Sequence, residues 1–180
     1  MIFTETAVPG AVVIELERFA DERGFFARSF CAREFAAHGL DARVAQCNVS
    51  FNRTKGTLRG LHFQRPPHAE AKFVRCTAGR VYDVIVDLRA DSPAFCRHLG
   101  IELSAHNRTM LYVPAGVAHG FQTLEDESEV FYQMSAPYER DAAAGVRWND
   151  AAFAITWPLA VSVISARDRG YPDFAGWEPR

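Results

Sequence analysis

Short runs in which apolar and polar residues alternate dominate the chain. The clearest is Arg80 to Arg89, which places Tyr82, Val84, Val86 and Leu88 on one face and Val81, Asp83, Ile85 and Asp87 on the other. Glu129 to Met134 alternates in the same way, with Val130, Tyr132 and Met134 sharing a face. A period of two residues is typical of a β-strand that buries at least one face. Both segments are therefore predicted to be strands.

Turn signals separate these runs into many short segments. Asp21-Glu22-Arg23 and Pro114-Ala115-Gly116 are typical turn sequences. Residues 31–39 are the best helix candidate, and Gly39 is suited to end that helix. Many short strands with intervening turns predict an all-β sandwich or barrel with few helices. No repeat, low-complexity linker or internal boundary interrupts the sequence, so we expect one domain over residues 1–180.

Composition and charge exclude several classes of protein. Hydrophobic residues make up 48% of the 180 residues and charged residues 23%, as in ordinary globular chains. A formal net charge of −2, without a basic run, gives no field that attracts nucleic acid. No apolar stretch approaches the ~20 residues of a membrane span, and the N-terminus does not resemble a signal peptide. We therefore expect a cytoplasmic protein with no nucleic-acid or membrane partner.

Neither cysteine nor histidine spacing indicates a metal site. The cysteines are Cys31, Cys47, Cys76 and Cys96, and none forms a CxxC pair. His62 lies in Gly60-Leu61-His62-Phe63-Gln64, without the second histidine that a cupin-type metal site usually places two residues away. We expect no bound metal and no disulfide framework, and we expect the cysteines to be small buried residues.

The segment from Lys55 to Gln64 combines a base with cations. Strict alternation in a strand would place His62 and Arg59 on opposite faces. Gly60 lies between them and is suited to a β-bulge, which would let both side chains reach one cavity. Taken alone, His62 is more typical of a structural histidine, and so is His119, which follows the turn at Pro114-Ala115-Gly116.

Other candidate groups lie further along the chain. Taken alone, Lys72 is typical of a strand edge, Tyr132 of a core and Asp168 of a loop. Asp83 and Asp87 need partners if they are buried, and either could orient a histidine or hold an arginine. A base, cations, a phenol and a carboxylate are together the groups that move a proton at a carbon next to a carbonyl.

Longer phrases of the sequence carry a family resemblance. They include DERGFF (21–26), KGTLRGLHFQRPP (55–67), AKFVRC (71–76), GRVYDVIVDLR (79–89), PAGVAHGF (114–121) and EVFYQMS (129–135). At these residues, and in this order along nearly the whole chain, the sequence resembles the dTDP-4-dehydrorhamnose 3,5-epimerase family. The resemblance implies a cupin-type jelly roll that uses neither metal nor other cofactor. It also implies a homodimer that acts on a nucleotide-diphosphate sugar.

The resemblance implies a role for each matching residue. His62 is the base that removes a proton from a sugar carbon, and Asp168 orients it. Tyr132 is the acid on the opposite face of the sugar, and Lys72 stabilises the enolate oxygen. The substrate contacts that it implies are Arg23, Gln46, Asn48, Arg59 and His119, with Tyr138 stacked on the base and Arg167 in place of a common lysine.

Two positions depart from the family pattern, in its substrate-binding shell. Arg28 and Ala143 each stand where the family usually has an acidic residue. The expected function is therefore epimerisation of a nucleotide-linked 4-keto-6-deoxy sugar at carbon 3, carbon 5 or both, with altered substrate contacts at Arg28. Two alternatives are a mono-epimerase of a dTDP-, CDP- or GDP-linked sugar and a non-catalytic cupin that binds sugar nucleotides.

Overall fold

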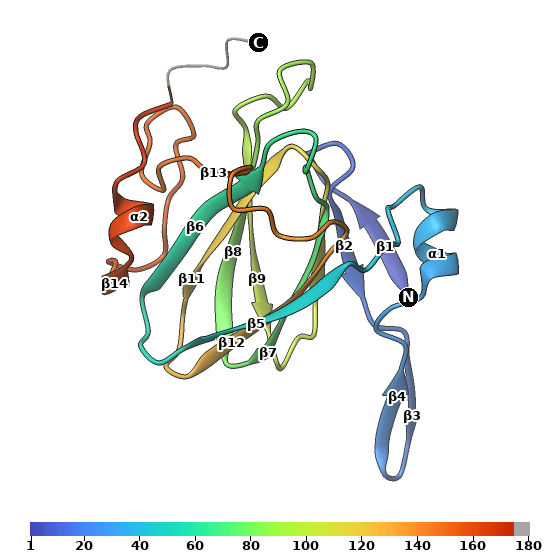
Figure 1. Cartoon of the computed structure of the whole chain (residues 1–180). Coiled ribbons are helices and arrows are strands. Elements are labelled where there is room, and N and C mark those ends of the chain that lie inside the picture. The colour runs from blue at the N-terminus through green and yellow to red at the C-terminus, as the bar shows by residue number, and fades with distance from the viewer. Residues whose placement is uncertain (175–180) are drawn as a thin grey trace.

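The computed structural model describes residues 1–174 and consists mainly of antiparallel strands in two facing sheets (Figure 1). The first sheet runs in the order β1 (Ile2–Glu5), β2 (Val12–Glu15), β10 (Met110–Val113), β7 (Lys72–Ala78), β12 (Ser128–Met134) and β5 (Gln46–Asn52). The second runs in the order β13 (Ala143–Gly145), β6 (Thr57–Gln64), β11 (Val117–Thr123), β8 (Arg80–Asp87) and β9 (His98–Ser104). β14 (Val163–Ile164) pairs with β6 in parallel. The predicted all-β sandwich is thus confirmed.

The main core lies between the two sheets. Val81 and Ile85 of β8 pack there with Val74 of β7 and Val130 of β12. The alternate residues of β8, including Val84 and Val86, belong to a second core on the outer side of their sheet. Both faces of β8 are therefore buried, and its sequence has apolar residues on both faces, as a strand covered on both sides requires.

The outer face of each sheet is covered by other segments of the chain. Segments C-terminal to β13 cover the second sheet, with Phe153 and Val146 packed against β8 residues. Helix α1 (Ala32–Ala37) covers the first sheet through Phe35, which is 1% exposed. The helix predicted over residues 31–39 is confirmed, and Gly39 follows it with a φ of 70°. Helix α2 (Ala166–Arg169) lies at the opposite end of the molecule from α1 (Figure 1).

A two-stranded hairpin projects from the body of the molecule. Its strands, β3 (Arg18–Asp21) and β4 (Gly24–Ala27), meet at the predicted turn, and Figure 1 shows them extending away from both sheets. Phe19 and Phe26 are 62% and 72% exposed on this hairpin, so it presents apolar surface to the surroundings.

Other expectations have mixed outcomes. The four cysteines are free, and only Cys76 is buried, so the prediction of four buried cysteines is wrong for the other three. Over residues 1–174, no helix combines the length and apolar character that crossing a membrane requires. The expected domain of residues 1–180 stays a prediction, since residues 175–180 lie outside the described part.

Candidate active site

A β-bulge in β6 brings two site residues to the same side of the strand. His119 of β11 pairs with His62, and Phe121 pairs with Arg59, so three steps along β6 match two along β11. Because Phe121 packs in the core between the sheets, its partner Arg59 also faces inward. The bulge expected at Gly60 is confirmed, and both Arg59 and His62 line one cavity of ≈ 210 Å³.

Two glycines make this local geometry possible. Gly60 has a φ of 116°, and a Cβ there would lie 2.6 Å from Cα of Gly120. A Cβ on Gly120 would in turn lie 2.5 Å from the carbonyl oxygen of Arg59. Real side chains do not tolerate such distances, so the close approach of β6 and β11 requires glycine at both positions.

His62 is paired with a buried carboxylate. Its Nε2 lies 2.7 Å from Oδ1 of Asp168, which is 4% exposed. The other Asp168 oxygen accepts a hydrogen bond from the Gly60 N–H, and the Asp168 N–H donates to Ser165, the residue that caps α2. Burial alone would raise the pKa of Asp168, but the hydrogen bonds from His62 and Gly60 and the charge of His62 together lower it.

This pairing determines which nitrogen of His62 is unprotonated when the ring is neutral. An ionised carboxylate only accepts hydrogen bonds, so Nε2 carries the proton that faces Asp168. In a neutral imidazole Nδ1 is then the unprotonated nitrogen. Nδ1 has no hydrogen-bond partner within residues 1–174 and is therefore available to take a proton from a ligand.

Lys72 and Tyr132 reach the same cavity from the first sheet. Lys72 is 7% exposed, and its Nζ donates to the carbonyl oxygen of His62 at 2.9 Å. Burial raises the pKa of Tyr132, although the nearby charge of Arg59 opposes this effect. The phenol therefore keeps its proton at neutral pH. His62 and Tyr132 line the cavity from opposite sheets, so a ligand in the cavity is within reach of both sheets.

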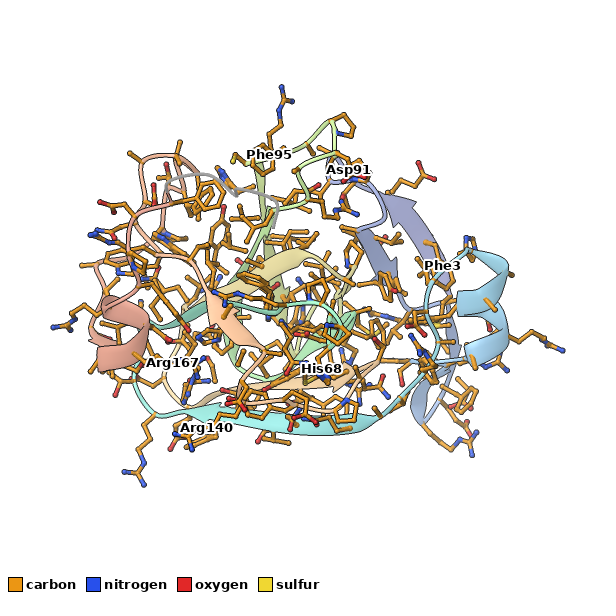
Figure 2. The ribbon with its side chains drawn as sticks, turned by 45° about the horizontal axis from the view of Figure 1, so that its top comes forward. Phe3, His68, Asp91, Phe95, Arg140 and Arg167 are labelled. Atoms are coloured by element: carbon orange, nitrogen blue, oxygen red, sulfur yellow. The ribbon has the colours of Figure 1, made fainter. Side chains whose placement is uncertain are left out.

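Most of the predicted binding residues surround this cavity. His119, Tyr138 and Arg167 line it together with Arg59. Figure 2 shows Arg167 on α2, and its hydrogen bond with Tyr138 raises the pKa of the Arg167 guanidinium. A second hollow of ≈ 370 Å³ lies between β6 and the β14–α2 segment and shares Arg59, His62 and Arg167 with the first.

Gln46 and Asn48 lie beside the cavity without lining it. They pair with Met134 and Tyr132 across β5 and β12, so they share the inward face of Tyr132. The Gln46 amide nitrogen donates to Asn48, and the Gln46 amide oxygen accepts from the Tyr138 N–H at 2.7 Å. This contact ties the segment that carries Tyr138 to β5.

Arg23 and Arg28 lie away from the cavity. Arg23 is at the tip of the projecting hairpin, where it pairs with Asp21. Arg28 pairs with Glu34 of α1 at 2.7 Å, at the end of the molecule opposite α2 (Figure 1). A single chain does not bring these two arginines to the site, and their predicted substrate contacts stay predictions. Ala143, by contrast, lines the cavity with a small apolar side chain.

One carboxylate at the site, Glu70, was missing from the predicted set of site residues. Glu70 lines the cavity and lies 2.9 Å from Lys72 Nζ. The spacing of two residues between them is a sequence signal that could have identified Glu70, because it places both on one side of an extended segment. Asp83 accepts from His119 at 2.8 Å, and Asp87 binds Arg89. The expectation that these aspartates orient a histidine or hold an arginine is therefore confirmed.

The site does not gather metal ligands among residues 1–174. His62 and His119 are direct partners across β6 and β11, but each ring is hydrogen-bonded to its own aspartate. No group of three or more histidine, cysteine, aspartate or glutamate side chains in this part of the chain is placed to hold a metal ion.

Comparisons with known proteins agree with this fold. The family model described as dTDP-4-dehydrorhamnose 3,5-epimerase matches residues 5–176. The protein of that name from Shigella flexneri is 42% identical over 91% of this chain and 91% of its own.

Two solved structures are similar over most of the chain. That of dTDP-4-dehydrorhamnose 3,5-epimerase from Bacillus anthracis, with TDP and PPi bound, has a TM-score of 0.91 and 42% identity, and covers 96% of this chain and 98% of its own. That of ChmJ, a 3′-monoepimerase from Streptomyces bikiniensis in complex with dTDP-quinovose, has a TM-score of 0.85 and 32% identity, and covers 93% and 85%.

These similarities confirm the expected cupin-type fold and an isomerase-class enzyme. They extend over nearly the whole chain. The chain therefore belongs to the dTDP-4-dehydrorhamnose 3,5-epimerase family.

Proposed function

We propose that this enzyme epimerises a nucleotide-diphosphate sugar of the dTDP-4-dehydro-6-deoxyglucose type at carbon 3, carbon 5 or both. The observation that carries the proposal is the cavity between the sheets, with a carboxylate-paired histidine on one sheet and the partly buried phenol of Tyr132 on the other. The ligands of two similar structures, TDP with PPi and dTDP-quinovose, support a substrate with a thymidine diphosphate group.

The first step is removal of a proton next to the carbon-4 ketone. His62 Nδ1 takes the proton, the C–H electron pair forms a C=C bond, and negative charge moves to the ketone oxygen. Asp168 stabilises the imidazolium that results. Lys72 donates to the new enolate oxygen, and one such donor in a water-poor site contributes about 3–4 kcal/mol to catalysis.

The second step returns a proton to the opposite face of the same carbon. Tyr132 gives up its O–H proton, the C=C electron pair forms the new C–H bond, and the ketone re-forms. The enzyme is left with a protonated His62 and a Tyr132 phenolate, and exchange with solvent restores both. Inversion requires two different groups because one base can only return its proton to the face it came from.

Arginine and aromatic side chains around the cavity suit the diphosphate and the nucleotide base of the substrate. Arg59 and Arg167 are shared by the two hollows and present guanidinium groups, which bind diphosphate oxygens well. Tyr138 is 50% exposed, so its ring is free to stack on a nucleotide base. His119 adds a polar group to the cavity wall and is oriented by Asp83, while Gln46 and Asn48 lie beside the cavity on β5.

We also propose a homodimer in the cytoplasm. The exposed Phe19 and Phe26 on the projecting hairpin, together with the exposed Val49 and Phe51 on the edge strand β5, are apolar surfaces that a second copy would cover. Arg23 lies on the same hairpin and is the predicted binding residue best placed to reach another copy. Four free cysteines are typical of a reducing compartment.

A mono-epimerase is the second candidate, because the similar protein ChmJ is a 3′-monoepimerase. The departure at Ala143 favours a substrate or outcome that differs from the usual one, since Ala143 leaves the cavity wall apolar beside Ala144. Both candidates use the same base and differ in how many carbons that base reaches.

Incubation with dTDP-4-keto-6-deoxyglucose in deuterated water tests the proposal. Deuterium at carbons 3 and 5 is expected for a double epimerase, and deuterium at one of them for a mono-epimerase. His62→Ala should reduce the exchange by about 10²–10⁴-fold. Binding without exchange would instead indicate a non-catalytic sugar-nucleotide-binding protein. Absence of exchange with dTDP-, CDP- and GDP-linked substrates would overturn the proposed reaction.

A further inference from the structure

Glu70 and Lys72 form an ion pair that is almost wholly buried. Glu70 is 5% exposed and Lys72 is 7% exposed, and Oε1 of Glu70 lies 2.9 Å from Nζ of Lys72. The second Glu70 oxygen, Oε2, is also buried and has no hydrogen-bond partner within residues 1–174. A buried carboxylate is costly to the fold unless its charge is balanced, and Lys72 is the cation that balances it.

The backbone between these two residues is held in place. Ala71 donates its N–H to Ser135 Oγ at 2.8 Å and accepts from the Ser135 N–H at 3.0 Å. Ser135 directly follows β12, the strand that carries Tyr132. Glu70, Lys72 and Tyr132 are thus fixed relative to one another by the end of one pair of strands.

The polar contacts of Lys72 show how Glu70 helps to hold its ammonium group in place. An ammonium group has three N–H donors. One N–H donates to the His62 carbonyl oxygen at 2.9 Å, and the positive charge of the ammonium group pairs with Glu70 Oε1. These two contacts fix where Nζ lies in the cavity wall, and they leave N–H capacity for a ligand oxygen.

We propose that Glu70 is a positioning residue, which holds the Lys72 ammonium group in place so that it can donate to the enolate oxygen. This inference rests on the proposed function, in which Lys72 stabilises that oxygen. The unpartnered Oε2 agrees with it, because a carboxylate kept for stability alone would have both oxygens satisfied. After burial itself, the negative charge of Glu70 also raises the pKa of Tyr132, which keeps the phenol in its proton-donating form.

The variant Glu70→Gln tests the proposal because it keeps size and hydrogen bonding but removes charge. In deuterated water, kcat and the exchange rate should both fall by about 10–100-fold, with KM changed less than about threefold. Glu15→Gln, at an exposed position on β2, is the matched control and should behave as the original enzyme. Melting temperatures of both variants establish that they are folded.

A double-mutant cycle separates positioning from a purely structural role. In a Lys72→Ala background, Glu70→Gln should change the residual exchange rate by less than about threefold, because the group through which it acts is gone. An equal loss in both backgrounds would overturn the proposal. So would a folded Glu70→Gln enzyme whose kcat is within about twofold of the original.

A measurement without substrate keeps this test independent of the proposed reaction. The Lys72 ammonium should give a slowly exchanging ¹⁵N-correlated NMR signal, identified by its loss in Lys72→Ala. In Glu70→Gln that signal should shift or vanish. An unchanged Lys72 signal would overturn the positioning role whatever the substrate is. A wild-type enzyme without exchange but with the expected NMR change would instead disprove only the proposed reaction.

Discussion

Two histidine–aspartate pairs of the same chemistry lie on neighbouring strands, and exposure distinguishes them. The His62 side chain is 41% exposed, whereas that of His119 is 9% exposed. A base must reach its substrate and exchange its proton with solvent between turnovers. His62 meets both requirements, whereas His119 is better suited to donate a fixed hydrogen bond within the cavity wall.

Replacing Asp168 by asparagine should remove the orientation of His62. The amide NH₂ of asparagine can donate to Nε2, which would move the imidazole proton to Nδ1 and block the base. We expect the exchange rate to fall by about 10²–10⁴-fold with little change in KM. Asp91→Asn, on an exposed loop far from α2 in Figure 2, is the control and should leave the rate unchanged. An Asp168→Asn enzyme with more than about a tenth of the exchange rate would contradict the role of Asp168.

Tyr132→Phe should separate the two proton transfers. His62 remains, so it can still remove the proton and return a deuteron from solvent to the same face of the carbon. The donor on the other face is lost, so inversion should fall by about 10²-fold or more relative to exchange. Comparing exchange by NMR with the amount of inverted product measures this ratio. If exchange and inversion fall together, a different group supplies the second proton.

At the scale of elements, the end of β8 depends on a buried carboxylate. Asp87 is fully buried and accepts hydrogen bonds from Arg89 and Ser92. Burial alone would raise the pKa of Asp87, but the hydrogen bonds from Arg89 and Ser92 together hold it below its ordinary value. Asp87→Asn should therefore lower the free energy of unfolding by about 2–4 kcal/mol at neutral pH.

This stability difference should depend on pH in a defined direction. A folded-state pKa below the unfolded value of about 3.9 means that the carboxylate stabilises the fold fully above that pH. The contribution declines below about pH 4 and is lost once the pH falls through the lower folded-state pKa. Denaturant titrations of the original and Asp87→Asn proteins should converge in acid. The exposed Asp141→Asn serves as control, and a gap that widens in acid would contradict this account.

Alternation of residue types is enough to predict the faces of β8 and β12 but not the whole site. β8 is buried on both sides, so each of its faces has a distinct set of apolar residues. In β6 the bulge breaks the period of two, and only Gly60 indicates it in the sequence. The pairing of His62 with Asp168 joins residues 106 positions apart and depends on how the C-terminal segment packs outside the sheet. Local pattern cannot predict such a contact, so the resemblance supplied it.

At the scale of the whole molecule, the hairpin and edge-strand surface should govern assembly. We expect the enzyme to form a dimer of the 20.1 kDa chain. Phe26→Ser removes the most exposed phenylalanine of the hairpin and should weaken the dimer by about tenfold or more. Sedimentation at several concentrations measures the dissociation constant. Val163→Ser, an exposed valine near α2, is the control, and equal dimerisation of both variants would remove the hairpin from the interface.

The contact between Gly60 and Gly120 restricts how this cavity can be altered by engineering or evolution. Each glycine excludes a side chain at the other position, since a Cβ on either one would overlap the opposing strand. Both positions therefore have to stay glycine together, because no substitution at one of them relieves the clash that a side chain at the other would cause. A library aimed at new sugar substrates should keep this pair constant and vary wall residues outside this contact, such as Ser50 and Ala143.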